Sequence, residues 1–177
     1  LPLIPYKAGA MLYFGNITDA CRAVQKLKPL PVDSAELLDR LSLRAVEDND
    51  GIPSFIKDLP DGATAVLLET KAMTPEELAV NIEAVKSAVS GFETLHPIEF
   101  TDKPEEYSKY WKIRSGVFPS VGGLRPTGTS CLIEDIVFPL DVMPEAVTDL
   151  QKLIADHGYK DGCIYGHSIE GNFHFII

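Results

Sequence analysis

The chain has 177 residues, a formal net charge of −10 and 45% hydrophobic residues. This length suits a single domain with a substantial core. The 16 lysines and arginines are scattered among 26 acidic residues and form no basic stripe, which argues against nucleic acid as a partner. No apolar run is long enough for a membrane span, and no signal peptide pattern is visible.

Three cysteines, Cys21, Cys131 and Cys163, stand far apart in the sequence, and no CxxC pair occurs. This spacing argues against a zinc ribbon, an iron–sulfur cluster or a disulfide framework in this segment. Reduced thiols of this kind indicate a cytoplasmic protein. The chain begins with Leu1 rather than Met, from which we expect a piece of a larger protein.

The first third of the chain contains one strand pattern and one clear helix pattern. Residues 8–15 (AGAMLYFG) are apolar and end in a turn residue, which predicts a strand. Residues 17–28 have apolar side chains at helical spacing and are followed by prolines, which predicts a helix. We predict a short helix and then an extended piece over 32–47, and a loop over the Pro-, Gly- and Asp-rich residues 48–62.

The next strand and helix have clear boundaries. Residues 63–72 (ATAVLLETKA) predict a strand, and residues 74–91 predict a helix. Thr74 can cap this helix, and Pro75 occupies the first helical position, where its missing N–H costs nothing. Glu77 can complete a capping box with Thr74.

The following segments alternate in the same way. Residues 92–100 predict a strand at a sheet edge or a bulge, because Pro97 interrupts them. Residues 102–118 predict a helix, 119–129 a Gly- and Pro-rich loop, and 130–140 a strand.

A helix that starts at Pro144 and a strand over 163–177 complete the pattern. Strand–helix–strand occurs twice, which predicts an α+β fold of the ferredoxin-like plait type, with a mostly antiparallel sheet and helices on one face. We expect 63–72, 92–100, 130–139 and 163–177 in that sheet, although the two units differ too much to be a sequence repeat. A doubly wound parallel sheet is the alternative, but no GxGxxG or GxxxxGK[ST] loop is present.

The last strand contains two histidines, His167 and His174, in the stretch GHSIEGNFHF (166–175). Side chains seven positions apart would face opposite sides of a regular strand. Gly171 indicates a bulge, and one extra residue would return both imidazoles to the same face. The pair can therefore be two metal ligands or two ordinary half-buried strand histidines.

Two arginines are candidates for binding an anion. Arg114 lies on the predicted helix, and Arg125 lies in the glycine-rich loop after it. The guanidinium fork matches a carboxylate, although a surface ion pair is the alternative for each residue. Glu134 and Asp135 alternate in the next strand, so only one of them can point toward the core.

The stretches WKIRSGVFPSVGGLRPTGTSCLIEDIVFP (111–139) and GHSIEGNFHF together resemble one family. They are similar to the C-terminal domain of the FAD-linked oxidases, in the branch of D-lactate dehydrogenase, glycolate oxidase and D-2-hydroxyglutarate dehydrogenase. The GLRP form of the first stretch is closest to the long members, which add an iron–sulfur module outside this segment. The close resemblance covers about residues 110–177.

The resemblance implies roles for five residues. Arg114 would bind the substrate carboxylate, and Arg125 would supply a second anionic contact. His167 and His174 would hold zinc or manganese, and Asn172 would contact the cofactor. It implies no catalytic residue within the chain, because the third metal ligand (a glutamate) and the catalytic base (a histidine) would follow Ile177, while the FAD-binding domain would precede Leu1.

The resemblance therefore implies a fragment, inactive alone, of a flavin-dependent 2-hydroxyacid dehydrogenase that acts on D-lactate or a similar substrate. Its partners would be the small 2-hydroxyacid and its own FAD domain, and its electron acceptor would bring the cytoplasmic protein to the inner membrane. Ile133 stands where shorter relatives carry a substrate-binding lysine. The alternative is a self-contained, non-enzymatic plait that binds a small anion or a partner chain.

Overall fold

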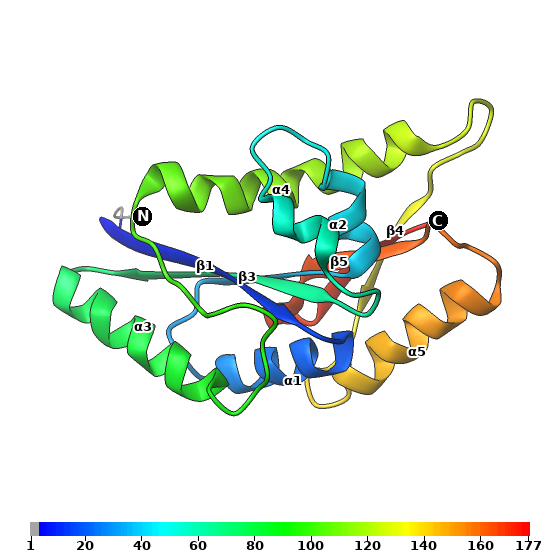
Figure 1. The fold of residues 1–177 in the computed structure, drawn as a ribbon. Coiled ribbons are helices and arrows are strands. Elements are labelled where there is room, and N and C mark those ends of the chain that lie inside the picture. The colour runs from blue at the N-terminus through cyan, green and yellow to red at the C-terminus, as the bar shows by residue number, and fades with distance from the viewer. Residues whose placement is uncertain (1–3) are drawn as a thin grey trace.

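Across residues 4–177, which this computed structural model describes, the chain forms a six-stranded sheet with helices on both sides (Figure 1). The strand order is β1-β3-β2-β5-β6-β4, and every neighbouring pair is antiparallel. The elements, with two short 3-10 helices η1 and η2, are β1 Tyr6–Phe14, α1 Ile17–Leu27, β2 Ser34–Leu38, α2 Arg40–Val46, η1 Ser54–Asp58, β3 Thr64–Ala72, α3 Pro75–Val89, α4 Pro104–Leu124, β4 Ile133–Val137, α5 Met143–Asp156, β5 Cys163–His167, η2 Ser168–Glu170 and β6 Asn172–Ile176.

The topology repeats even though the sequence does not. In β1-α1-β2-β3 the third strand lies between the first two, and in β4-α5-β5-β6 it does so again. The crossover helices α1 and α5 contact each other, and the hydroxyls of Thr18 and Thr148 lie 2.9 Å apart. The two halves join where β2 pairs with β5. The predicted α+β plait with an antiparallel sheet is confirmed.

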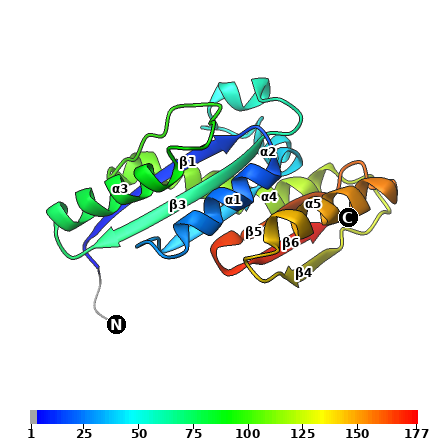
Figure 2. The same ribbon diagram turned by 90° about the horizontal axis from the view of Figure 1, so that it is seen from below.

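Helices cover both faces of the sheet, whereas we expected helices on one face. α1, α3 and α5 pack on one side, and α2 and α4 pack on the other, as Figures 1 and 2 show. The reason lies in the strands of the first half, because β1 and β3 bury successive residues on both faces. Such strands read as continuous apolar runs rather than as an alternation, and they need cover on both sides.

The helix starts follow from capping side chains. Thr74 Oγ1 accepts a hydrogen bond from the backbone N–H of Glu77 at 3.2 Å, as predicted for α3. The carboxylate of Glu77 accepts in return from the N–H of Met73 at 2.9 Å. α1 is capped in the same way by Asn16.

Three segments differ from the prediction. The order within 32–47 is reversed, because β2 comes first and α2 follows it. Residues 92–100 form no regular strand; they run beside β1 through isolated bridges, and Pro97 cannot donate to a ladder. Helix α4 continues past Pro119, and we attribute this to the burial of Val117 and Val121 in the core.

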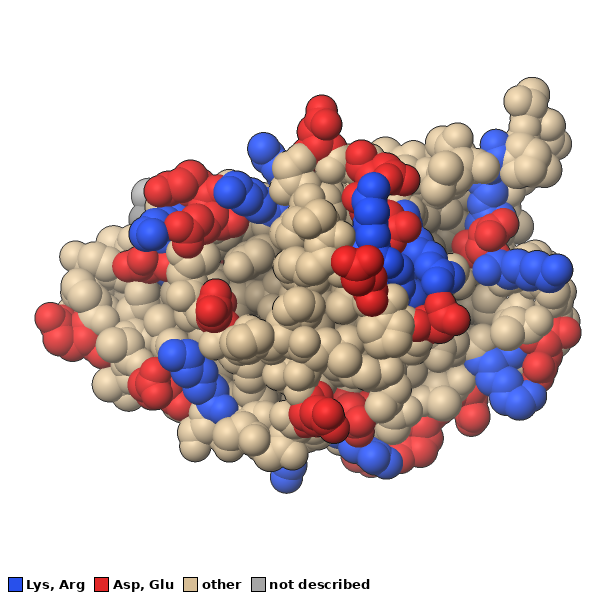
Figure 3. Space-filling view, in the orientation of Figure 1, with Lys and Arg blue, Asp and Glu red and all other residues tan. Residues whose placement is uncertain are grey.

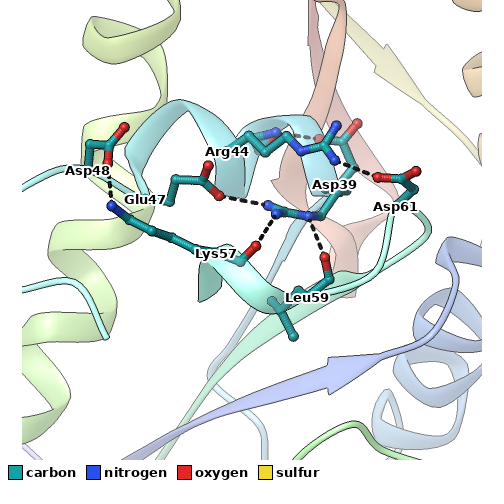
Figure 4. A network of polar contacts seen from close by, with 9 residues as sticks. Asp39, Arg44, Glu47, Asp48, Lys57, Leu59 and Asp61 are labelled. Carbon is teal, nitrogen blue, oxygen red and sulfur yellow. Dashed lines mark hydrogen bonds and ion pairs between the residues drawn. The ribbon is translucent and has the colours of Figure 1, made fainter. Parts of the chain in front are cut away.

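A buried arginine ties the loop after α2 to the fold (Figure 4). Arg40 donates from Nε to the carbonyl of Leu59 at 3.2 Å and from Nη2 to that of Lys57 at 3.3 Å. Its Nη1 pairs with Glu47 at 3.2 Å. The partners account for the burial of this charge, so Arg40 has a structural role.

Among the described residues, no helix is both long and apolar enough to cross a membrane.

Candidate functional site

The two histidines of the last motif lie on the same face of the sheet. Their ring centroids are 5.7 Å apart, and His174 pairs across the ladder with Tyr165. The chain between them is a hairpin rather than one bulged strand. β5 ends at His167, η2 makes one short turn, and Gly171 with φ 69° leads into β6. The irregular backbone expected near Gly171 is thus a complete reversal of the chain.

Each imidazole is held by a carboxylate on the neighbouring strand. His167 Nδ1 lies 2.5 Å from Glu36 of β2, and His174 Nδ1 lies 2.5 Å from Asp135 of β4. Both pairs are direct cross-strand neighbours in the sheet register. When Nδ1–H donates to a carboxylate, the other ring nitrogen, Nε2, carries the free lone pair. The sheet therefore presents two Nε2 atoms that can accept a proton or bind a metal.

Arg114 reaches the same place from helix α4. Its Nε donates to Glu36 at 2.7 Å, and its guanidinium carbon lies 4.7 Å from the ring centroid of Tyr165. Glu36 is only 5% exposed, and its two oxygens contact Arg114 and His167. A buried carboxylate needs such partners. Because the bond to Glu36 uses Nε, it leaves the Nη atoms of the guanidinium for another ligand.

The ring of Tyr165 lies against both Arg114 and His174. Burial raises the pKa of its phenol to about 12, although the nearby Arg114 acts in the opposite direction. The phenol therefore stays protonated at neutral pH and can donate a hydrogen bond. Its ring also lies 5.3 Å from that of His174, measured between centroids.

Arg125 follows the last residue of α4, eleven positions after Arg114. At 1.5 Å per residue, the two backbones are about 16 Å apart along the helix. The second anionic contact expected from Arg125 stays a prediction. Asn172 begins β6 on the same face as His174 and is half-buried.

The two imidazoles fit as metal ligands, each with a carboxylate partner of the kind that orients ligand histidines. Catalytic zinc sites use three protein ligands. Within residues 4–177, no group of three His, Cys, Asp or Glu side chains is arranged to hold an ion. A complete metal centre would need one more ligand than this part of the chain supplies.

Two residues of the site, Glu36 and Tyr165, were not predicted from the sequence. Glu36 lies in a segment that was predicted to begin as a helix. The single acid in the apolar stretch SAELL could nevertheless have indicated a candidate site residue. Tyr165 stands two positions before His167, which is the spacing of one strand face. Reading CIYGH as an alternating strand would have placed both side chains together.

A family model described as "FAD linked oxidases, C-terminal domain" matches residues 5–177. The chain belongs to this family. Among solved structures, it is similar to alkyldihydroxyacetonephosphate synthase in two crystal forms, P1 and P212121, with TM-scores of 0.67 and 0.66 and identities of 12% and 11%. These likenesses concern the fold. They cover 99% of this chain but only 37% and 36% of those chains, so it spans little more than a third of their length. No curated protein was found to match.

Proposed function

We propose that this domain is the substrate-binding part of a flavin-dependent 2-hydroxyacid dehydrogenase, acting on D-lactate or a similar acid. The family supports a parent flavoenzyme, and the branch rests on the resemblance of residues 110–177. The single observation that carries the proposal is the shared carboxylate of Glu36, which joins Arg114 to His167. It holds a carboxylate receptor and an imidazole within reach of one small molecule.

Arg114 binds the substrate carboxylate through its Nη atoms. A guanidinium presents a rigid fork that matches two carboxylate oxygens. Glu36 acts as a positioning residue, because its bond to Nε fixes the plane of the fork. Tyr165 beneath the guanidinium limits its movement further. The substrate is thus oriented before any chemistry occurs.

The 2-hydroxyl of the substrate then faces His167 and His174. The hydroxyl and the carboxylate stand on adjacent atoms of such an acid, so their receptors must also be neighbours. When bound, zinc or manganese supplies Lewis acidity toward the hydroxyl and FAD supplies the hydride acceptor. This chain orients the ligand nitrogens through Glu36 and Asp135.

The flavin domain is the proposed partner of the open part of this face. Helices α2 and α4 contact strands other than β4. Ile133 and Val137 of β4 are 40% and 65% exposed on the side of the sheet that carries Asp135. Asn172 pairs with Val137 and lies beside them. We assign Asn172 to a cofactor contact, because a flavin domain docked here would bring its ring to this strand.

The test is anaerobic flavin reduction in the full-length protein that carries this chain. We expect D-lactate, D-2-hydroxyglutarate or glycolate to bleach the flavin, and Arg114→Lys to raise KM at least about tenfold, because an ammonium cannot form the fork. Arg22→Lys is the matched control, since Arg22 pairs with Asp19 and Glu145 on the opposite side of the sheet.

Two results would contradict the proposal. Failure of every 2-hydroxyacid to reduce the flavin would remove the substrate class. An unchanged KM in Arg114→Lys would remove the assigned carboxylate receptor. If the chain binds small anions but none of them reduces the flavin, the alternative of a non-enzymatic plait is favoured.

A further inference from the structure

A pocket lies beside the edge strand β1, where the segment 92–100 runs past it. Its volume is about 290 Å³, close to the lower end of the range for small-molecule sites. Four parts of the chain each contribute an aromatic ring to its lining, namely Tyr13 from β1, Phe55 from η1, His96 from 92–100 and Tyr110 from α4. Segments far apart in the sequence therefore gather four rings around one small pocket.

Three of these rings stand at different angles around the pocket. The rings of Tyr13 and Phe55 meet edge to face, with centroids 5.3 Å apart and planes at 85°. Tyr13 meets His96 in the same way, at 5.7 Å and 72°. The rings of Phe55 and His96 are 4.1 Å apart and tilted by 42°. Rings that cross in this way form adjoining walls rather than a flat stack, and adjoining aromatic walls are the arrangement that binds a cation through the π faces.

The backbone holds these walls in place. The N–H of Leu95 donates to the carbonyl oxygen of Tyr13 at 2.7 Å, which fixes His96 beside the edge strand. Pro97 follows His96, and Pro53 stands directly before η1. Each proline fixes its own φ, so the segments that carry His96 and the ring of η1 have little freedom. A pocket built in this way needs little ordering when a ligand binds.

The charge of the pocket favours a positively charged ligand. Glu99 lines it, and among the residues that the structure describes no lysine or arginine does so. Burial, Glu106 and Glu99 raise the pKa of Tyr110, so its ring carries a neutral phenol at neutral pH. Figure 3 shows uncharged side chains across the middle of the face that the segment 92–100 crosses, with charged ones around them. The whole chain has a net charge of −10.

The pocket is separate from the site assigned to the 2-hydroxyacid. Met11 lines the pocket, and both Met11 and Glu36 pair with Leu67, from opposite sides of β3. Two spacings between strands therefore separate Met11 from Glu36, which is about 10 Å. Binding in this pocket does not depend on the proposed dehydrogenase function.

We propose that this pocket binds a small quaternary ammonium compound. The positive headgroup lies between the rings of Tyr13, Phe55 and Tyr110, with Glu99 beside it. A quaternary ammonium group donates no hydrogen bond, so aromatic walls can replace the water around it. A primary ammonium group has three donors to satisfy and is strongly hydrated, whereas the pocket lining includes a single carboxylate.

The experiment follows methionine methyl groups by NMR in the isotope-labelled full-length protein that carries this chain. Met11 reports on the pocket, and its signal is identified by its loss in Met11→Leu. The probes are choline, its primary ammonium counterpart ethanolamine, and the neutral alcohol in which a tert-butyl group replaces the trimethylammonium group of choline. We expect choline to shift the Met11 signal saturably and to bind at least about tenfold more tightly than either of the other probes.

Variants of the lining test where the ligand lies. Phe55→Leu and Tyr110→Leu keep an apolar side chain but remove a ring, so each should weaken choline binding severalfold and leave binding of the neutral alcohol unchanged. Glu99→Gln should also weaken choline binding severalfold. Phe118→Leu and Glu93→Gln are the matched controls and should change nothing, because neither residue lines the pocket.

No binding of choline, or equal affinity for choline and the neutral alcohol, would overturn the assignment to a cation. Tighter binding of ethanolamine would overturn the assignment to a quaternary ammonium group. Choline binding that leaves the Met11 signal unshifted, or that survives both Phe55→Leu and Glu99→Gln, would show that the ligand sits elsewhere. Glu99 is exposed, so Glu99→Gln keeps the test valid if a ring variant fails to fold.

Discussion

At the scale of single residues, Glu36 organises the candidate site. It is a buried acid in a central strand, and its two oxygens meet Arg114 from a helix and His167 from the next strand. Removing one partner of such a cluster leaves an uncompensated charge, which is strongly destabilising when buried. Glu36 therefore couples the stability of this face to the orientation of both candidate ligands.

Asp39 gives a prediction at the same scale. It caps α2 by accepting from Ser42 at 2.8 Å and also accepts from the N–H of Ile164 at 2.9 Å. Burial raises the pKa of its carboxyl from 3.8 to about 6, although these hydrogen bonds lower it. Because the pKa is higher in the folded state, this group contributes stability below pH 4 that is lost as the pH rises through 6.

The wild type loses this stability as the pH rises, whereas Asn cannot ionise. We therefore expect the free energy of unfolding of Asp39→Asn to rise relative to that of the wild type, by roughly 3 kcal/mol between pH 4 and pH 7. Urea unfolding at several pH values measures the difference in free energy. Asp50→Asn, at an exposed position, should show no such change. A constant difference between Asp39→Asn and the wild type would mean that Asp39 does not titrate in this range.

At the scale of elements, the hairpin from β5 to β6 decides whether the histidines meet. Gly171 has φ 69°, and a Cβ there would lie 2.1 Å from the carbonyl oxygen of Phe138. That conformation favours glycine, and the contact leaves no space for a side chain. The turn, together with the Tyr165–His174 register, places both imidazoles on one face.

Gly171→Ala should therefore destabilise the domain by more than about 2 kcal/mol, because strain and a backbone clash add. Gly122→Ala is the matched control, since Gly122 lies in α4 and a Cβ added there would meet nothing within 4 Å. It should be neutral or slightly stabilising. Thermal unfolding of both variants tests this, and equal melting temperatures would refute the structural role of the turn.

At the scale of the whole molecule, the candidate site lies where the two topological halves join. Glu36 belongs to the first half, and Asp135, His167 and His174 belong to the second. Helix α4, which connects the halves, supplies Arg114. The site therefore exists only when both halves are folded and joined through β2 and β5.

Zinc binding by the chain should consequently be weak, because residues 4–177 offer two imidazoles and no set of three ligands. We expect stoichiometric chelator to remove the ion, and His167→Ala or His174→Ala to lower the affinity at least about tenfold. His157→Ala is the control, since His157 caps α5 outside the site. Tight binding, or binding that His167→Ala leaves unchanged, would contradict the two-ligand site.

Features that depend on neighbouring residues were predictable from the residue pattern. The strand over 63–72 and the helix capped by Thr74 and Glu77 were predictable, because apolar periodicity and capping act within a few residues. The motif GHSIEGNFHF likewise indicated paired histidines. The secondary structure of segments 32–47 and 92–100 was not predictable. Packing against distant helices and strands overrides the local secondary-structure propensity there.

The contacts between the candidate residues depend on how distant elements pack together. Glu36 and His167 are 131 positions apart in sequence, and their contact depends on the pairing of β2 with β5. Arg114 meets Glu36 and Tyr165 only because α4 packs over β2 and β5. Strand order and helix length are long-range properties of packing, so residue types and local spacing identified the candidates while the assembled sheet selected among them.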